Sequence, residues 1–412
     1  MKIFKVEAFA IQAQPIDTRP YWGSRAWGSE RAPGSAELST EYPSPLRRRF
    51  IYSRTIDTVV VRIETDDGLV GWGESKAPVA PQATARIIEL LLAPIVLGAD
   101  PRDVLVLWER MYAGMRVRGH RAGFHIEAIA GVDIALWDLA GQAASAPVST
   151  LLGGRMRESV RVYASGIPSL PLEAPDEAIQ AVVAEARSIA AAGYTGVKIA
   201  VGRGVAGDLR TIRAIRDAIG DGFAIYADAA GVYSRTDAMR MGHALEELGA
   251  GFFEMPIAPE DVEGYAELAQ GLTIPIALDS IMTRHETVEL IRNRAIDIVQ
   301  PDVCRAGGIT ECRRIAELAD CFGLAFQPHV SIGSAIHVAA SAHLAVAMPN
   351  SLVCEYWIGK NPIGAAIAHH PAEVRDGYLF PPQAPGLGIG LDAHALLAHR
   401  AESAIAGRTS PC

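Results

Sequence analysis

From about residue 160 onward, short apolar runs recur along the chain, and seven of them end at a residue that can carry charge. Successive chargeable residues are 30, 26, 25, 23, 27 and 26 positions apart, which leaves room for one strand and one helix per interval. Strict alternation of strand and helix predicts a parallel sheet, and eight such strands favour a closed barrel. The chargeable strand ends are Lys198, Asp228, Glu254, Asp279, Asp302, His329 and Glu355.

The first 125 residues carry a different pattern, in which strand-like alternation comes first and helical spacing follows. The sequence Asp66-Asp67-Gly68 is a hairpin signal between two of the strands. We therefore expect an α+β domain over residues 1–125, a barrel over 126–385 and a C-terminal segment over 386–412 that returns to the first domain. Strands are predicted over residues 1–11, 58–64 and 69–72, and helices over 82–96, 104–113, 124–144, 178–191, 207–219, 235–248, 287–293, 310–321 and 335–347.

Composition excludes several classes of protein. The 412 residues are half apolar and carry a net charge of -9, and Arg47–Arg49, interpreted as a solvated turn, is the single basic run, so no nucleic-acid partner is expected. The five cysteines form no CxxC pair, which favours reduced thiols in a cytoplasmic protein. The start of the chain is broken by Lys5 and Glu7, and no apolar run is long enough for a bilayer, so no membrane partner is expected.

The acids Asp228, Glu254 and Asp279 would end three consecutive strands. Because the carboxyl ends of parallel barrel strands share one face, these side chains should converge, and converging carboxylates repel unless a cation lies between them. Hard oxygen ligands with open positions favour Mg²⁺. The alternative is that each acid caps the helix that follows it, as Asp commonly does. Three such acids in succession favour the metal site.

His329 and Asp302 are predicted to form a general base, because a carboxylate bonded to an imidazole fixes its tautomer and raises its basicity. The alternative for His329 is a structural role at the barrel rim, which is also how His337 and His343 are interpreted. Lys198 is either a base or fixed positive charge beside a bound carboxylate, or a surface lysine. Glu355, if protonated, would donate to an oxyanion; otherwise it is a buried, paired acid. Together the groups suit removal of a proton α to a carboxylate.

Motifs over nearly the whole chain resemble those of the enolase superfamily and, within it, the mandelate racemase subgroup. The segments that carry the resemblance are GVDIALWDLAGQ, VSTLLGG, RVYASG, VKIAVG, IVQPDVCRAGG, PHVSIG and PGLGIGLD. The resemblance implies an α+β capping domain on a modified (β/α)₇β barrel, one Mg²⁺ per site, a small carboxylate substrate and a homo-oligomer. It carries metal-ligand roles to the three acids at 228, 254 and 279, and the base dyad to Asp302 and His329. Glu355 matches the family's eighth-strand acid.

The chain departs from the family pattern in ways that bear on the reaction. Ala200 stands where a second lysine is common, so a base is evident on one face of the substrate alone, which argues against a two-base racemase or epimerase. Met255 follows Glu254 where a second Glu is common, and Ser280 follows Asp279 where Gly-Glu is common. In the cap, Tyr21, Trp22 and Arg25 would set substrate choice, or would only pack.

The resemblance therefore implies a dehydratase that converts an aldonate or aldarate to a 2-keto-3-deoxy acid. Cycloisomerisation of a sugar-acid lactone is the second hypothesis, because parts of the chain are similar to galactarolactone cycloisomerases. A racemase or epimerase, and a paralogue that binds acid sugars without turnover, remain further alternatives. A structural protein on a barrel scaffold would not need its strand-end acids to converge.

Overall fold

The computed structural model describes residues 1–14, 25–26, 51–53 and 55–401 of the chain. Tyr21, Trp22 and Arg47–Arg49 lie outside the described residues. Arg25 belongs to the short strand β2 (Arg25–Ala26), which pairs with β3 (Ile51–Tyr52), but its side chain is not described.

The N-terminal region is a three-stranded antiparallel sheet with helices on it. The strands β1 (Ile3–Ala13), β4 (Ile56–Thr65) and β5 (Val70–Ser75) lie in that order and confirm the predicted strands and hairpin. Gly68 closes the β4–β5 turn with φ 89°, a conformation that favours glycine. The predicted helices form as α1 (Pro81–Ile87), the π-helical turn η2 (Ile88–Leu92), α2 (Ala93–Val96) and α3 (Val104–Arg116).

The helix α4 (Phe124–Ala143) lies between this sheet and the barrel. The sheet approaches it closely, because a Cβ on Gly73 would lie 1.9 Å from the carbonyl oxygen of Gly131. On the barrel side the carboxylate of Asp133 accepts hydrogen bonds from the Thr310 backbone N at 2.9 Å and hydroxyl at 2.6 Å. The helix is therefore buried on both sides, and the division of the chain at residues 125 and 385 stays a prediction.

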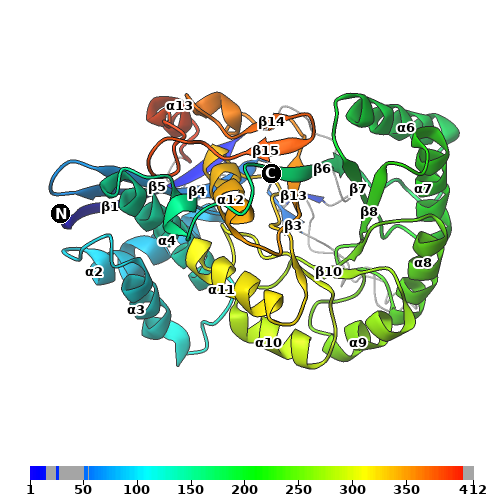
Figure 1. Ribbon diagram of the computed structural model, residues 1–412, viewed down its shortest axis with the longest axis horizontal. Helices are drawn as coiled ribbons and strands as arrows, with labels where there is room; N and C mark the ends of the chain where they lie inside the picture. Colours follow the sequence, from blue (N-terminus) through cyan, green and yellow to red (C-terminus); the bar gives the residue numbers. More distant parts are fainter. Residues whose placement is uncertain (15–24, 27–50, 54, 402–412) are drawn as a thin grey trace, which may run out of the picture.

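Eight parallel strands and seven helices alternate from residue 160 to residue 357 (Figure 1). The strand β13 pairs with β6, and the ladder continues in chain order to β12. The strands are β6 (Val160–Ile167), β7 (Gly196–Ala200), β8 (Ala224–Asp228), β9 (Phe253–Glu254), β10 (Ile276–Leu278), β11 (Ile298–Val299), β12 (Ala325–Phe326) and β13 (Val353–Trp357). The helices are α6 (Asp176–Ala191), α7 (Val205–Ile219), α8 (Arg235–Glu247), α9 (Val262–Gly271), α10 (Arg284–Arg292), α11 (Gly308–Asp320) and α12 (Ala335–Ala347).

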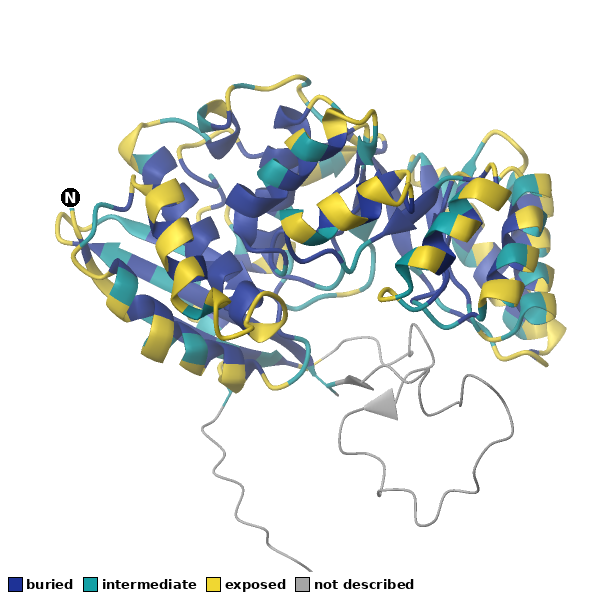
Figure 2. Cartoon of the chain, turned by 90° about the horizontal axis from the view of Figure 1, so that it is seen from below, coloured by how far each residue is buried: buried dark blue, intermediate teal, exposed yellow. Residues whose placement is uncertain are grey.

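The two ends of the barrel sheet meet between β12 and β13. The backbone N of Phe326 donates to the Asn350 oxygen at 3.0 Å, and that of Glu355 donates to the Pro328 oxygen at 3.4 Å. Helices α6 to α10 follow one another around the outside of the strands, and their exposed residues face outward (Figures 1 and 2). This architecture confirms the predicted (β/α)₇β barrel with an α+β domain beside it.

The barrel interior is built in layers, because side chains on a strand alternate and every second residue faces inward. The floor is an apolar layer of Tyr163, Tyr226, Phe252, Ala277, Ile298, Ala325 and Val353. Two positions later on the same strands, the next layer is polar throughout. With Lys198 from β7, that layer comprises Ser165, Asp228, Glu254, Asp279, Gln300, Gln327 and Glu355.

The remaining elements are short and connect or extend the two parts of the structure. A helical turn, α5 (Val148–Leu151), follows α4, and the hairpin β14 (Glu373–Arg375) and β15 (Tyr378–Phe380) extends the barrel sheet beside β6. After η3 (Ala365–Ile367) and α13 (Ala393–Leu397), the chain returns to β1, where the Ala401 backbone N donates to the Ala10 oxygen at 2.8 Å. None of the described helices is both long enough and apolar enough to traverse a bilayer.

Candidate active site

Three of the predicted acids surround the ammonium of Lys198 at the centre of the polar layer. Its Nζ lies 2.9 Å from both carboxylate oxygens of Glu254, 2.8 Å from Glu355 Oε1 and 3.4 Å from Asp228 Oδ2. The Lys198 side chain is 1% exposed, so the interpretation as a surface lysine is wrong. The structure therefore brings together residues that are 157 positions apart in the chain (355 minus 198).

The electrostatics of this cluster show an excess of negative charge. Burial raises the pKa of Asp228 to about 6, and burial together with the neighbouring Asp228 raises that of Glu254 well above its usual value. Burial alone would lower the pKa of Lys198, but Glu254 and Glu355 outweigh it and hold that pKa well above normal. One ammonium thus does not compensate the carboxylates that face it.

Glu355 differs from Asp228 and Glu254 in that its pKa is lowered. Burial raises the pKa of its carboxyl, but Lys198 and His329 outweigh this and bring the pKa to about 2. Its Oε2 accepts a hydrogen bond from the Val330 backbone N at 3.0 Å. Glu355 therefore stands here as a buried, paired acid, and its role as a protonated donor stays a prediction.

His329 joins the acid cluster to the predicted dyad. Its Nδ1 lies 2.9 Å from Asp302 Oδ2, and its Nε2 lies 3.6 Å from oxygens of both Asp279 and Glu355. Because Nδ1 is engaged by Asp302, a neutral ring held by that bond has its basic nitrogen directed at the acid cluster. The dyad geometry that the sequence predicted is thus present.

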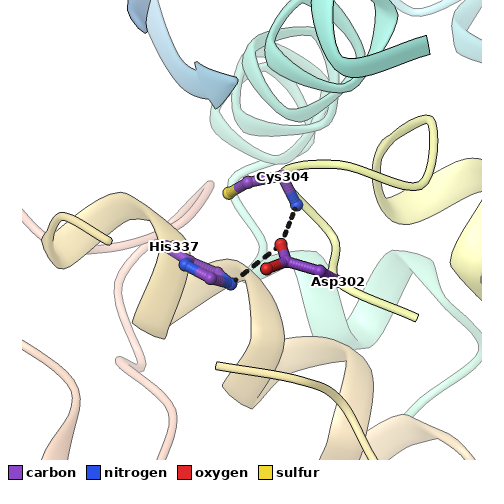
Figure 3. Close-up of side chains that lie close together, drawn as sticks. All are labelled: Asp302, Cys304 and His337. Carbon is purple, nitrogen blue, oxygen red and sulfur yellow. Dashed lines mark hydrogen bonds and ion pairs between the residues drawn. The ribbon is translucent and has the colours of Figure 1, made fainter. Parts of the chain in front are cut away.

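Asp302 is held by groups that the sequence did not indicate (Figure 3). Its Oδ1 accepts from the Cys304 backbone N at 2.8 Å and lies 3.1 Å from His337 Nε2. Its Oδ2 lies 3.2 Å from the Nζ of Lys76, a residue that directly follows β5. Burial raises the pKa of Asp302, but His337 and Lys76 outweigh it and hold that pKa well below normal.

The two histidines interpreted as structural are both buried and paired, but their partners differ. His343 is structural, since its Nε2 lies 3.1 Å from the Leu387 oxygen and burial lowers its pKa to about 4. His337 instead contacts the dyad acid. The helical pattern over residues 335–347 placed both histidines on one helix and carried no signal for this contact.

The side chains that face one another at this site fit a divalent cation. One ligand atom each from Glu254, Asp279 and His329 lies within 4.8 Å of the others. Among the described residues, Asp279 Oδ1 is buried without a hydrogen-bond partner, which leaves an acceptor for an ion. Asp228 Oδ1 accepts from the Ala230 backbone N at 2.9 Å, which holds its own turn; the following helix, α8, is capped by Ser234 and not by this acid, contrary to the capping alternative. The oxygen-rich donor set suits a hard ion.

Gln300 is a further member of the site that sequence reasoning missed. Its Nε2 donates to Glu254 Oε2 at 3.3 Å, and among the described residues its Oε1 is buried without a partner. The signal was available in the sequence, because Gln300 lies two positions before Asp302 and strand alternation places both on the barrel interior. By the same alternation Ala200 follows Lys198 on the interior face of β7, so a methyl group occupies that position.

Two sequence families match the chain. Residues 38–153 match "Mandelate racemase / muconate lactonizing enzyme, N-terminal domain", and residues 181–395 match "Enolase C-terminal domain-like". The chain belongs to the enolase superfamily. Within this superfamily it is a member of the mandelate racemase subgroup, as its motifs indicated.

Relatives of this superfamily member include two named enzymes. D-galactarolactone cycloisomerase of Agrobacterium fabrum is 36% identical over 83% of this chain and 91% of its own length. Arabinonate dehydratase of Saccharolobus solfataricus is 37% identical over 81% of this chain and 88% of its own. The crystal structure of 3,6-anhydro-D-galactonate cycloisomerase from Zobellia galactanivorans superposes with a TM-score of 0.82 at 29% identity, covering 98% of this chain and 100% of that one.

Proposed function

We propose that this enolase superfamily member removes the proton α to the carboxylate of a sugar acid and eliminates water to give a 2-keto-3-deoxy acid. The observation that carries the proposal is the orientation of His329. Its Nδ1 is bonded to Asp302, and its Nε2 points at the acid cluster from one side. The relative named arabinonate dehydratase supports this class of reaction.

Asp228, Glu254 and Asp279 are proposed to hold one Mg²⁺. When bound, the ion supplies positive charge next to the oxygens of the substrate carboxylate. The excess of buried carboxylates over ammonium groups and the free oxygen of Asp279 support this assignment. Lys198 keeps a second, fixed positive charge beside these acids, because its raised pKa leaves it protonated at neutral pH.

The chain's own residues supply the proton transfers. His329 Nε2 takes the α-proton, and the electron pair of the broken C–H bond forms the enolate of the acid. That pair then forms the C2–C3 double bond, while the C3–O bond breaks and the imidazolium returns its proton to the departing hydroxyl as water. The resulting enol tautomerises to the 2-keto acid. A single base thus serves both proton transfers on one face.

A lactone cycloisomerase is the second candidate function. It uses the same proton abstraction, but the enolate expels the lactone oxygen and not a hydroxyl. The relatives named D-galactarolactone cycloisomerase and 3,6-anhydro-D-galactonate cycloisomerase favour it. The capping domain residues that would choose between these substrates, Tyr21, Trp22 and Arg25, stay predictions, as does homo-oligomerisation.

A substrate panel tests the proposal. The panel contains arabinonate, galactonate, xylonate, galactarate and galactarolactone with Mg²⁺, and the readout is 2-keto acid formation. Deuterium incorporation at C2 in D₂O is measured in parallel, because it reports proton abstraction even where no group leaves. His329→Asn and Glu254→Ala should abolish both signals while their circular dichroism stays that of the parent. Full elimination activity in His329→Asn contradicts the base assignment, and a silent parent favours a binding protein.

A further inference from the structure

The three-stranded N-terminal sheet of β1, β4 and β5, called the capping sheet below, reaches the Asp302–His329 dyad through Lys76. Lys76 directly follows β5, and its backbone N donates to the Cys304 oxygen at 2.9 Å, which ties this sheet to the loop after β11. Its side chain is only 8% exposed. The Nζ donates to the hydroxyl of Ser331 and lies 3.2 Å from Asp302 Oδ2. A residue far from the barrel in sequence therefore contacts the acid that orients the proposed base.

Four donors surround the Asp302 carboxylate and fix its plane. His329 Nδ1 and Lys76 Nζ share Oδ2, at 2.9 Å and 3.2 Å. Oδ1 faces the Cys304 backbone N at 2.8 Å and His337 Nε2 at 3.1 Å (Figure 3). An ionised carboxylate offers about four acceptor sites, so this set occupies all of them. Lys76 is one of the two donors to Oδ2, the oxygen that also contacts His329.

We propose that Lys76, supplied by the capping sheet, is a positioning residue for the Asp302–His329 dyad. The inference rests on the proposed function, in which His329 is the base. Lys76 acts through the Asp302 carboxylate, whose buried negative charge it offsets from the side opposite His337. Removing Lys76 is expected to change the rate of proton transfer and not the binding of substrate.

The strand β5 also supplies a control for the alternative that Lys76 only holds the capping sheet on the barrel. Glu74, two positions earlier on β5, accepts hydrogen bonds from the backbone N of Ser334 at 3.0 Å and of His337 at 3.2 Å. These contacts hold the start of α12 against the capping sheet, at the amino end where a carboxylate is favoured. If Lys76 only fastened the sheet to the barrel, loss of Glu74 should have the same kinetic consequence as loss of Lys76.

The test compares Lys76→Met, Asp302→Asn, the double variant and Glu74→Gln with the parent protein. Each is assayed with Mg²⁺ on the panel member that the parent converts fastest, and kcat and KM are measured separately. Lys76→Met should lower kcat by about 10- to 100-fold, by analogy with the loss of a hydrogen-bond partner behind a metal-ligating histidine, with KM changed by less than about twofold. Lys5→Met, an exposed lysine on β1 of the same sheet, is the matched control and should behave as the parent.

The double variant makes the test independent of folding problems in Lys76→Met. It removes both charges of the pair, so no uncompensated charge is left buried. If Lys76 works through Asp302, the double variant has the same kcat as Asp302→Asn. A further loss of kcat in the double variant, a kcat of Lys76→Met within about threefold of the parent, or an equal loss in Glu74→Gln overturns the inference. A parent that is silent across the panel overturns the proposed function, and this inference with it.

Discussion

Replacing Lys198 with Met tests whether the acid cluster is organised around positive charge. The ammonium lies 2.9 Å from Glu254, 2.8 Å from Glu355 and 3.4 Å from Asp228, and the side chain is 1% exposed. Met keeps most of the side-chain length and removes the charge. Removing one partner of a buried ion pair costs about 3–5 kcal/mol, because the remaining charge stays buried without compensation. We expect a loss of stability in this range when divalent ions are chelated.

The assay is thermal unfolding followed by circular dichroism, in EDTA and in excess Mg²⁺. At about 2–4 °C per kcal/mol for large domains, the expected loss lowers Tm by about 6–20 °C in EDTA. Mg²⁺ that binds only the folded state adds RT ln(1 + [L]/Kd) of stability, and this gain should be larger for Lys198→Met because its acids lack the ammonium. The deficit should therefore shrink when Mg²⁺ is added.

The control is Lys5→Met, which removes an exposed pair with Glu7 at 2.8 Å. Exposed pairs contribute at most about 1 kcal/mol, so this variant should unfold close to the parent in both buffers. Equal Tm values for Lys198→Met and the parent in EDTA would refute the argument from buried charge. A parent whose Tm does not rise in Mg²⁺ would refute the assignment of the acids as a metal site, and a deficit that Mg²⁺ leaves unchanged would refute the link between Lys198 and that site.

Three further predictions follow from the same geometry. Burial raises the pKa of Asp228 from 3.8 to about 6, so its carboxyl binds a proton more tightly in the folded than in the unfolded protein. When divalent ions are chelated, the free energy of unfolding should therefore fall by on the order of 3 kcal/mol as pH rises from about 4 to 6. Urea unfolding across this range measures this change and its sign. Ala200 offers no second base, so substrate that exchanges its C2 proton in D₂O should keep its original configuration at C2. Chiral chromatography of the recovered acid will test this. Epimer formation would argue for a base opposite His329. Gly73→Ala places a Cβ 1.9 Å from the Gly131 oxygen, and this overpacking should lower the free energy of unfolding in urea by about 1–3 kcal/mol or more. Gly68→Ala, which has open space around the added Cβ, should lower it by the smaller cost of a positive φ alone.

Strand periodicity determined most of the barrel in advance. The alternation of apolar runs and helical spacing located its strands, and the last helix was predicted at the residues where α12 lies, 335–347. The helix α9 (Val262–Gly271) was implied by the spacing between Glu254 and Asp279, but its residues were not predicted. The structure shows its apolar side resting on a small set, Tyr265 and Leu268, so the local pattern was weak. Periodicity records which residues face inward, and it does so only where enough of them are apolar.

Strand ends also determined the core of the candidate site. Glu254 and Glu355 each lie two positions beyond the apolar floor of the barrel, Lys198 lies in the same polar layer, and closure of the sheet alone brings them together. The sequence could thus predict which side chains meet at the centre of the barrel. It could not predict the charge state of the group, because the raised pKa of Glu254 depends on burial and the nearby Asp228, and the lowered pKa of Glu355 depends on its short distances to Lys198 and His329.

Contacts between the capping sheet and the barrel were decided by the tertiary structure alone. Lys76 and Asp302 are 226 positions apart, and neither the alternation of β5 nor the spacing of α12 indicates that Lys76 and His337 reach the same carboxylate. The physical reason is that alternation and helical spacing describe each element's own inward face, whereas these contacts depend on how two separately patterned units pack together. The sequence by itself determined a barrel with acids and a histidine at its strand ends, and only the packing of the sheet onto that barrel decided what surrounds the base.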